Sequence, residues 1–267
     1  MTTIARVALS VFRESVRDRI LYSIVVFAVL LMAASYLLGQ LTAGQDLKII
    51  KDLGLASIAT FGLFIAVFIG IGLVSKEVEK RSIYALLSKP IRRTEFILGK
   101  YCGLVLTLVV NVAVMTLAFY AVMVFLDWRL DPLTGTWSVP PTDPRMLTAI
   151  ALIVVELMLV TAIALFFSTF STPFLSAGLT LGLWVIGHFN ADLRNFEGVV
   201  DSPAAVWLAR VLYYVLPNFG AFDIKAQVVH GQPVAISYVG LVALYGLTYV
   251  VLVLTAATMI FSRRDFK

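Results

Sequence analysis

The stretch Met146–Phe167 reads MLTAIALIVVELMLVTAIALFF, and Glu156 is its one charged residue. As an α-helix, its 22 residues extend ~33 Å at 1.5 Å per residue. That length crosses the ~30 Å hydrocarbon core of a bilayer. Because a chain in lipid must satisfy its own backbone hydrogen bonds, such a stretch forms a helix. It predicts a transmembrane helix.

The composition extends this prediction to the whole chain. Hydrophobic residues make up 60% of the 267 residues and charged residues 14%, whereas soluble proteins have about 45–50% and about 25%. A soluble fold with so few polar residues cannot cover its surface. The sequence therefore predicts an all-α, polytopic membrane protein.

Further apolar runs predict six transmembrane helices within a single domain, 1–267. The other runs lie at about 20–41, 55–74, 101–126, 174–189 and 238–261. A seventh apolar stretch at 203–216 opens with Ser202-Pro203, a favourable helix start, and stops before Pro217. Because it is too short to span, we expect a short re-entrant or interfacial helix there, in an external region 190–237 before the last span.

The N-terminal segment 1–19 has the pattern of an amphipathic helix. Its apolar residues recur three and four positions apart, and its arginines lie away from that stripe. A basic amphipathic helix before a span commonly lies in the membrane interface. We therefore predict an interfacial helix; a plain positively charged flank is the alternative.

The distribution of Lys and Arg predicts the orientation in the membrane. With both termini inside, the cytoplasmic segments hold 14 basic residues and the external segments hold seven. By the positive-inside rule, both termini of this inner-membrane protein are expected to be cytoplasmic. The formal charge of +5 then faces anionic lipid or a protein partner, and we expect no nucleic-acid partner.

The most charged connection is Lys76–Lys100, which reads KEVEKRSIYALLSKPIRRTEFILGK. Glu77 and Arg81 are four residues apart, a favourable spacing on an exposed helix. Apolar residues follow at Ile83, Leu86 and Leu87, and Pro90 ends the helix because it lacks a backbone donor. Such a helix suits docking into a groove of another protein. A charged loop that only enforces topology is the alternative.

These elements resemble the type-2 permeases of ATP-binding-cassette transporters. The resemblance lies in an acidic-basic stretch, a Leu-Leu-Ser-x-Pro-Ile-x-Arg element and a Leu-Gly-Lys before the third span. Here they stand as Glu77–Arg81, Leu86–Arg93 and Leu98–Lys100. The nearest branch is similar to the permease of nitrous-oxide-reductase maturation systems.

The resemblance implies the membrane-spanning subunit of an ATP-driven exporter. Two permease subunits, expected to be identical, would work with two cytoplasmic ATPase subunits and a periplasmic accessory protein. The segment 76–96 would be the coupling helix that receives the motion of the ATPase. The implied coupling residues are Glu77, Glu79, Lys80, Arg81, Ile83, Leu86, Leu87, Pro90, Arg92 and Arg93.

Motifs for chemistry are missing from the sequence. It contains no Gly-x-x-x-x-Gly-Lys-Ser/Thr loop for phosphate. It also contains neither Gly-x-Ser-x-Gly nor His-Glu-x-x-His, the motifs of serine and zinc hydrolases. We expect no catalytic site, metal or cofactor on this chain, and we expect ATP and Mg²⁺ on the partner ATPase.

Two polar residues stand at similar depth in predicted spans, Glu156 and Asn111. An ionised carboxylate at mid-membrane costs on the order of 2.5–3.5 kcal/mol or more, so Glu156 is expected to be neutral, paired or facing water. A hydrogen bond to Asn111 across neighbouring helices would make the pair a clamp. The other interpretation is a polar lining of a transport path, and a stand-alone secondary transporter or channel using Glu156 is the rival function.

Small residues four apart predict close helix packing in two spans. One stripe holds Gly62, Ala66 and Gly70, and the other holds Gly178 and Gly182. We interpret both as packing within one subunit, with a seam between subunits as the alternative. Trp184 is interpreted, with the three other tryptophans, as an anchor at the membrane interface.

Overall fold

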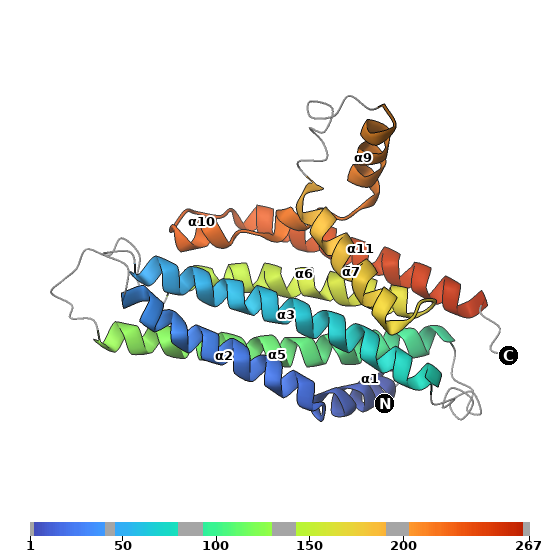
Figure 1. Ribbon diagram of the computed structural model, residues 1–267, viewed down its shortest axis with the longest axis horizontal. Coiled ribbons are helices and arrows are strands. Elements are labelled where there is room, and N and C mark those ends of the chain that lie inside the picture. The colour runs from blue at the N-terminus through green and yellow to red at the C-terminus, as the bar shows by residue number, and fades with distance from the viewer. Residues whose placement is uncertain (1–2, 41–45, 80–92, 130–142, 191–202, 264–267) are drawn as a thin grey trace.

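The computed structural model describes residues 3–40, 46–79, 93–129, 143–190 and 203–263 (Figure 1). Within these ranges the chain forms helices and their connections and no strand, which confirms the all-α prediction. The elements are α1 (Thr3–Val16), α2 (Arg19–Gln40), α3 (Asp46–Glu79), α5 (Arg93–Arg129), α6 (Arg145–Ser168), α7 (Pro173–His188), α9 (Pro203–Val215), the 3-10 helix η3 (Phe219–Phe222), α10 (Lys225–Val229) and α11 (Ile236–Arg263).

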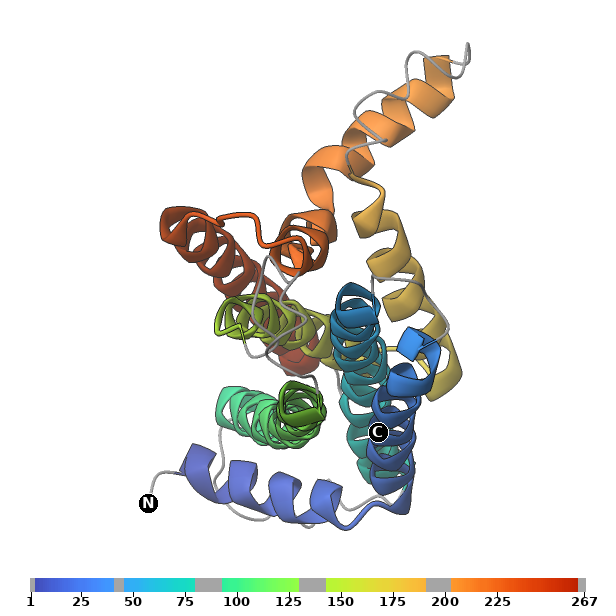
Figure 2. The same ribbon diagram turned by 90° about the vertical axis from the view of Figure 1, so that its left-hand side faces the viewer.

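The long helices run side by side along the long axis of the molecule (Figures 1 and 2). Among the described residues, four segments are long and apolar enough to cross a membrane: Lys48–Ile71, Thr94–Phe125, Arg145–Ser168 and Ile236–Ser262. A fifth span results if α1 and the part of α2 at Leu21–Ser35, bent by 63° relative to each other, are counted as one. The protein is thus a multi-pass membrane protein, and the count of six spans stays a prediction.

Helix α7 is one reason why the six apolar runs of the sequence do not correspond to six helices long enough to cross a membrane. It begins at Pro173, favoured in the first turn, and ends after 16 residues at His188. That is ~24 Å, short of the hydrocarbon thickness. Helix α9 covers the stretch predicted at 203–216 and stands away from the bundle, and the chain returns through η3 and α10 (Figure 1).

Helix α6 lies at the centre of the fold and contacts α3, α5, α7 and α11. Small residues of α3 allow a close approach of the two helices. A Cβ atom at Gly70 would lie 2.6 Å from Cβ of Ala164, and one at Gly62 would overlap Leu157. Ala66 is 1% exposed. The prediction that this stripe packs within one subunit is confirmed.

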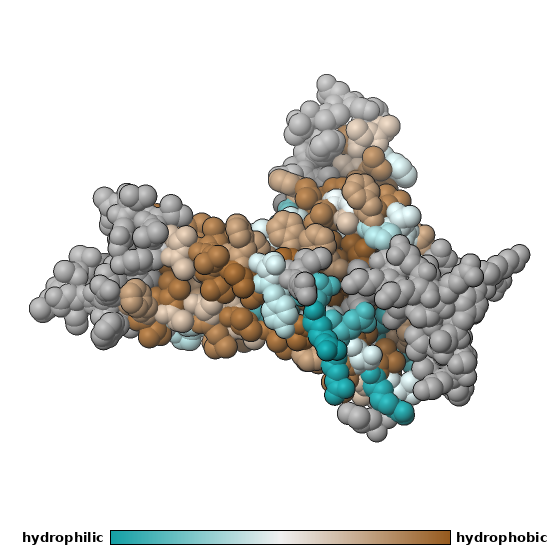
Figure 3. Space-filling view, turned by 60° about the horizontal axis from the view of Figure 1, so that its bottom comes forward, coloured by the Kyte–Doolittle hydropathy of each residue, from teal (hydrophilic) through white to brown (hydrophobic). Residues whose placement is uncertain are grey.

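Helix α1 lies crosswise to the long helices along one side of the bundle (Figure 2), near the end of the bundle where α3 ends and α5 begins (Figure 1). We call this end the α1 end. Its apolar stripe packs on α5 rather than facing outward. A Cβ at Gly99 would lie 2.7 Å from Cβ of Val7, and one at Gly103 would lie 2.6 Å from the carbonyl oxygen of Ala8. On the opposite side, Arg6, Arg13 and Arg17 are exposed. Figure 3 shows the face that carries α1, where a few hydrophilic residues interrupt a hydrophobic surface.

Helices α3 and α5 are longer than the apolar runs that predicted them. Helix α3 has 34 residues and α5 has 37, whereas the predicted spans were 55–74 and 101–126. Hydropathy detects only the apolar part of a helix. Lys, Glu and Arg favour the helical conformation almost as much as Leu does, so a helix can continue through charged residues. Both helices therefore extend beyond their apolar segments.

Candidate functional site

The ends of α3 and α5 place the predicted coupling segment at the α1 end of the bundle (Figure 1). Glu77 and Glu79 belong to the end of α3, and Arg93 opens α5. The ends of segment 76–96 are thus continuous with the two long helices, and the coupling helix between them stays a prediction. The remaining predicted coupling residues, Lys80, Arg81, Ile83, Leu86, Leu87, Pro90 and Arg92, lie outside the described residues.

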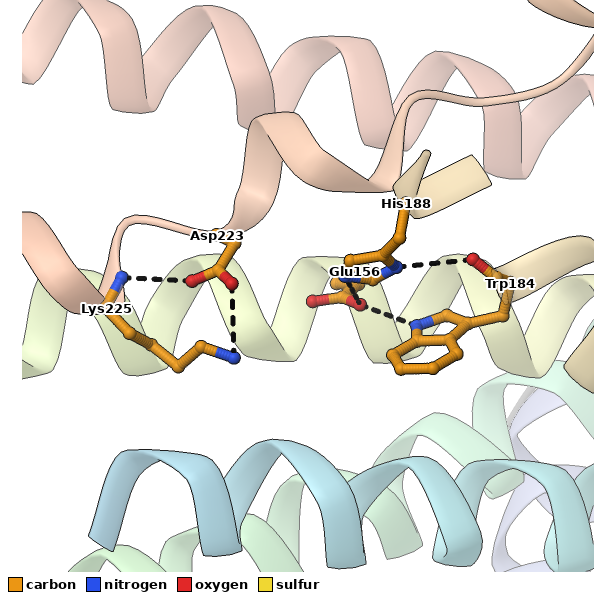
Figure 4. Close-up of polar contacts among 5 residues, drawn as sticks. All are labelled: Glu156, Trp184, His188, Asp223 and Lys225. Atoms are coloured by element: carbon orange, nitrogen blue, oxygen red, sulfur yellow. Dashed lines mark hydrogen bonds and ion pairs between the residues drawn. The ribbon is translucent and has the colours of Figure 1, made fainter. Parts of the chain in front are cut away.

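A polar cluster lies inside the bundle, where α6 meets α7 (Figure 4). Glu156 is the eleventh residue after Arg145, at ~17 Å along α6, and it is 7% exposed. The indole Nε1 of Trp184 donates a hydrogen bond of 2.8 Å to its Oε1. The same oxygen lies 3.8 Å from Nε2 of His188. We call Glu156, Trp184 and His188 the Glu156 centre.

The two α7 residues reach Glu156 together because they are four apart and share one face of the helix. Their rings lie 4.3 Å apart between centroids. Nδ1 of His188 lies 3.2 Å from the backbone carbonyl of Trp184. These contacts orient the imidazole so that Nε2 is the ring nitrogen nearest the carboxylate.

The far side of the imidazole is covered by η3. The ring of Phe219 stacks on His188 with centroids 5.9 Å apart and planes inclined by 11°. A Cβ at Gly187 would lie 2.6 Å from the carbonyl oxygen of Pro217, so only glycine lets α7 approach this turn. The backbone N–H of Asn218 in turn donates 2.9 Å to the hydroxyl of Tyr245 on α11. The end of α7, η3 and α11 thus form one packed unit around the Glu156 centre.

A second pair of charges lies beside the centre on the same side of α6 (Figure 4). Asp223 and Lys225 form an ion pair of 3.5 Å, with side chains 40% and 24% exposed. The neighbouring residue Phe222 shows how deep in the bundle this pair lies. Its ring would lie 3.0 Å from a Cβ at Gly246. Gly246 is ten residues, or ~15 Å, from the start of α11. Because an exposed charge at such depth is costly in lipid, water or protein must cover this pair.

The predicted hydrogen bond between Glu156 and Asn111 is wrong. The amide nitrogen of Asn111 donates 2.7 Å to the carbonyl of Thr107 in its own helix, while Glu156 bonds to α7. Trp184 is likewise a partner of Glu156 in this structure rather than an interface anchor. Sequence reasoning missed His188 as a member of the site. The sequence did contain a signal for it. Trp184 and His188 are four residues apart on one predicted helix, and the span before that helix contains the carboxyl group of Glu156.

The Glu156 centre can form hydrogen bonds and bind protons. It holds one carboxyl group and one imidazole. Among the residues that the structure describes, no group of three or more His, Cys, Asp or Glu side chains is placed to hold a metal ion. The hydrogen bond from Trp184 makes the centre an interhelical clamp between α6 and α7.

Comparison with known proteins adds a family to this geometry. Residues 6–194 match the family described as ABC-2 family transporter protein, which is 189 of the 267 residues. The matched part runs from α1 to just beyond α7 and includes segment 76–96. No curated protein sequence matches the chain.

Proposed function

The chain belongs to the ABC-2 transporter family, and on that premise we propose that it is the membrane-spanning subunit of an ATP-driven exporter. The match over residues 6–194 carries the proposal. The multi-pass helical bundle agrees with it, because a transport subunit must provide several packed spans. The nearer branch, similar to the permease of nitrous-oxide-reductase maturation systems, remains part of this proposal.

The ATPase would be a separate cytoplasmic chain that docks at the α1 end. Two features support this: the sequence has no phosphate-binding loop, and its most charged connection, 76–96, joins α3 to α5 at that end. An ATPase can drive transport only if its nucleotide states bind this element differently. The α1 end would then be cytoplasmic, with both termini inside and the exposed arginines of α1 at the inner membrane interface.

A second, identical subunit would pack against the outer face of α7. The inner face of this helix is buried through Ser176, Thr180 and Gly187. On the opposite face, a Cβ at Gly178 or Gly182 would meet no heavy atom within 4 Å. Glycines four apart leave a shallow groove that another helix fills better than lipid chains do. The open space at Gly178 and Gly182 does not support their interpretation as packing within one subunit, and it supports the alternative, a seam between two subunits.

The experiment that tests the proposed function is purification of the tagged chain from native membranes with mild detergent. We expect an ATPase subunit to co-purify, and we expect its ATP hydrolysis to rise when the chain is present in lipid. A functional stand-alone chain that transports without any ATPase would favour the rival, a secondary transporter or channel using Glu156.

A further inference from the structure

We propose that Glu156 and His188 form a proton-binding site inside the membrane, in which the two side chains together hold one proton, either on Oε1 of Glu156 or on Nε2 of His188. This proton keeps the pair between α6 and α7 electrically neutral. The inference concerns the Glu156 centre and does not depend on the ATPase partner, so it stands or falls separately from the proposed function.

The first step is the tautomer of His188. Its Nδ1 lies 3.2 Å from the backbone carbonyl oxygen of Trp184. A carbonyl oxygen only accepts hydrogen bonds, so Nδ1 must carry a proton. In a neutral imidazole the other nitrogen, Nε2, is then an unprotonated acceptor. It is Nε2 that lies 3.8 Å from Oε1 of Glu156.

The second step is the number of protons between these two atoms. With none, a carboxylate faces the lone pair of Nε2 and two acceptors oppose each other. With one, the pair is either a carboxylic acid beside a neutral imidazole or a carboxylate beside an imidazolium, and both arrangements are neutral overall. With two, a buried net positive charge results. Because the burial of net charge is costly, the pair is expected to hold one proton.

The third step is the charge on the elements packed around the pair. Lys225 and Asp223 act on Glu156 with opposite signs, and at 3.5 Å they largely neutralise each other. Helix α11 contributes Tyr245 nearby, and α5 contributes the hydroxyl of Tyr101, which donates 3.2 Å to the carbonyl of Met158. Residues 53–75 of α3 contain no titratable side chain. Within the described structure, these groups provide no net positive charge to stabilise a bare Glu156 carboxylate.

The fourth step is access. The centre itself is buried, but the Asp223 side chain beside it is 40% exposed. As argued above, an exposed charge at this depth requires water or protein against it. Where water covers Asp223, it provides a route by which the proton of the pair exchanges with bulk solvent.

The consequence for the fold lies at the end of α7. His188 is held between Glu156 on one side and Phe219 of η3 on the other. Removal of the shared proton leaves two acceptors facing each other and weakens the contact of α7 with α6. At neutral pH the folded chain thus binds a proton that the unfolded chain releases. The free energy of unfolding is therefore higher at lower pH and decreases as the pH rises.

The test measures the protonation of both groups directly in the full chain in lipid. Infrared spectra of the wild type and E156Q report a protonated carboxyl group, and ¹⁵N NMR of His188 reports whether each ring nitrogen carries a proton. We expect one shared proton at about pH 6.5, seen either as a carboxyl band absent from E156Q or as doubly protonated His188. It should leave on titration to about pH 9.

Two variants make the result decisive. E156Q keeps an acceptor for Trp184 but cannot share a proton. Over the pH range in which the thermal unfolding temperature of the wild type falls with rising pH, we expect that of E156Q to stay constant. H188N should shift the pH at which the Glu156 band disappears, whereas H230N, at an exposed histidine, should not. An ionised Glu156 beside a neutral His188 throughout this pH range would overturn the proposal. So would identical titration of His188 in wild type and E156Q.

Discussion

Helices α3 and α7 both carry small residues four positions apart, but only the stripe on α3 is covered within the chain. Gly62 and Gly70 lie against Leu157 and Ala164 of α6, whereas nothing lies within 4 Å of a Cβ built at Gly178 or Gly182. The same sequence pattern thus predicts that another helix packs closely on the stripe, but it does not predict which helix. On α3 the partner is α6, and on α7 we propose a second copy of the chain.

The largest effect is expected at the covered stripe. Gly62→Leu and Gly70→Leu place side chains where α6 already lies, and overpacking of a close-packed core costs typically about 1–3 kcal/mol per site. We expect the double variant to lose most of its folded yield in detergent, measured by fluorescence-detected size exclusion and thermal unfolding. Gly240→Leu on α11 is the matched control, because a Cβ there meets nothing within 4 Å. Equal stability of the double variant and this control would refute the packing of α3 on α6.

The second effect concerns the open stripe. Gly178→Leu with Gly182→Leu should leave the single chain folded, because the added atoms point into open space. We expect the dimer to dissociate, measured as mass by light scattering in detergent. A cysteine at position 182 in a Cys102→Ser background should cross-link two chains. A dimer that withstands both substitutions and gives no cross-link would place the seam elsewhere.

A third, smaller effect is expected on the inner face of α7. Trp184→Phe removes the indole donor to Glu156 but keeps an aromatic ring. Hydrogen bonds between membrane helices contribute about 0.6 kcal/mol on average, with a maximum of about 1.7 kcal/mol, and we expect a loss within that range by unfolding in mixed micelles. Trp207→Phe on α9, where the side chain is 66% exposed, serves as the control. A loss no larger than that of the control would show that the bond to Glu156 contributes nothing.

The smallest effect is expected at Asn111. Its amide bonds to the carbonyl of Thr107 in the same helix. Asn111→Leu therefore removes a hydrogen bond within one helix and should change stability by less than about 0.5 kcal/mol. Unfolding in the same micelles measures it. A loss comparable to that of Trp184→Phe would restore the clamp that the sequence predicted between Asn111 and Glu156.

The fold was predictable where hydropathy and helix-end residues agree. The run at 146–167 differs from α6 by one residue at each end, and Ser202-Pro203 marked the start of α9. The lengths of α3 and α5 were not predictable in this way, because hydropathy does not detect helix that continues past the membrane.

The site was predictable in part. The cost of a buried charge singled out Glu156, but depth alone does not say which way a side chain points. The rotation of α7 about its axis brings Trp184 and His188 to Glu156, while Asn111 bonds within α5. That rotation depends on packing at Gly187 against the turn before η3, a contact between segments about thirty residues apart that no local pattern reveals.

The central claim is that a separate ATPase drives this chain through segment 76–96. The most direct measurement is ATP hydrolysis by the co-purified partner, compared between the wild type and the double variant Leu86→Asp with Leu87→Asp, both reconstituted in lipid. Charge placed in the predicted apolar contact should abolish both co-purification and stimulation of hydrolysis, while the long helices remain folded. Co-purification and stimulation at wild-type levels in the double variant would contradict the account.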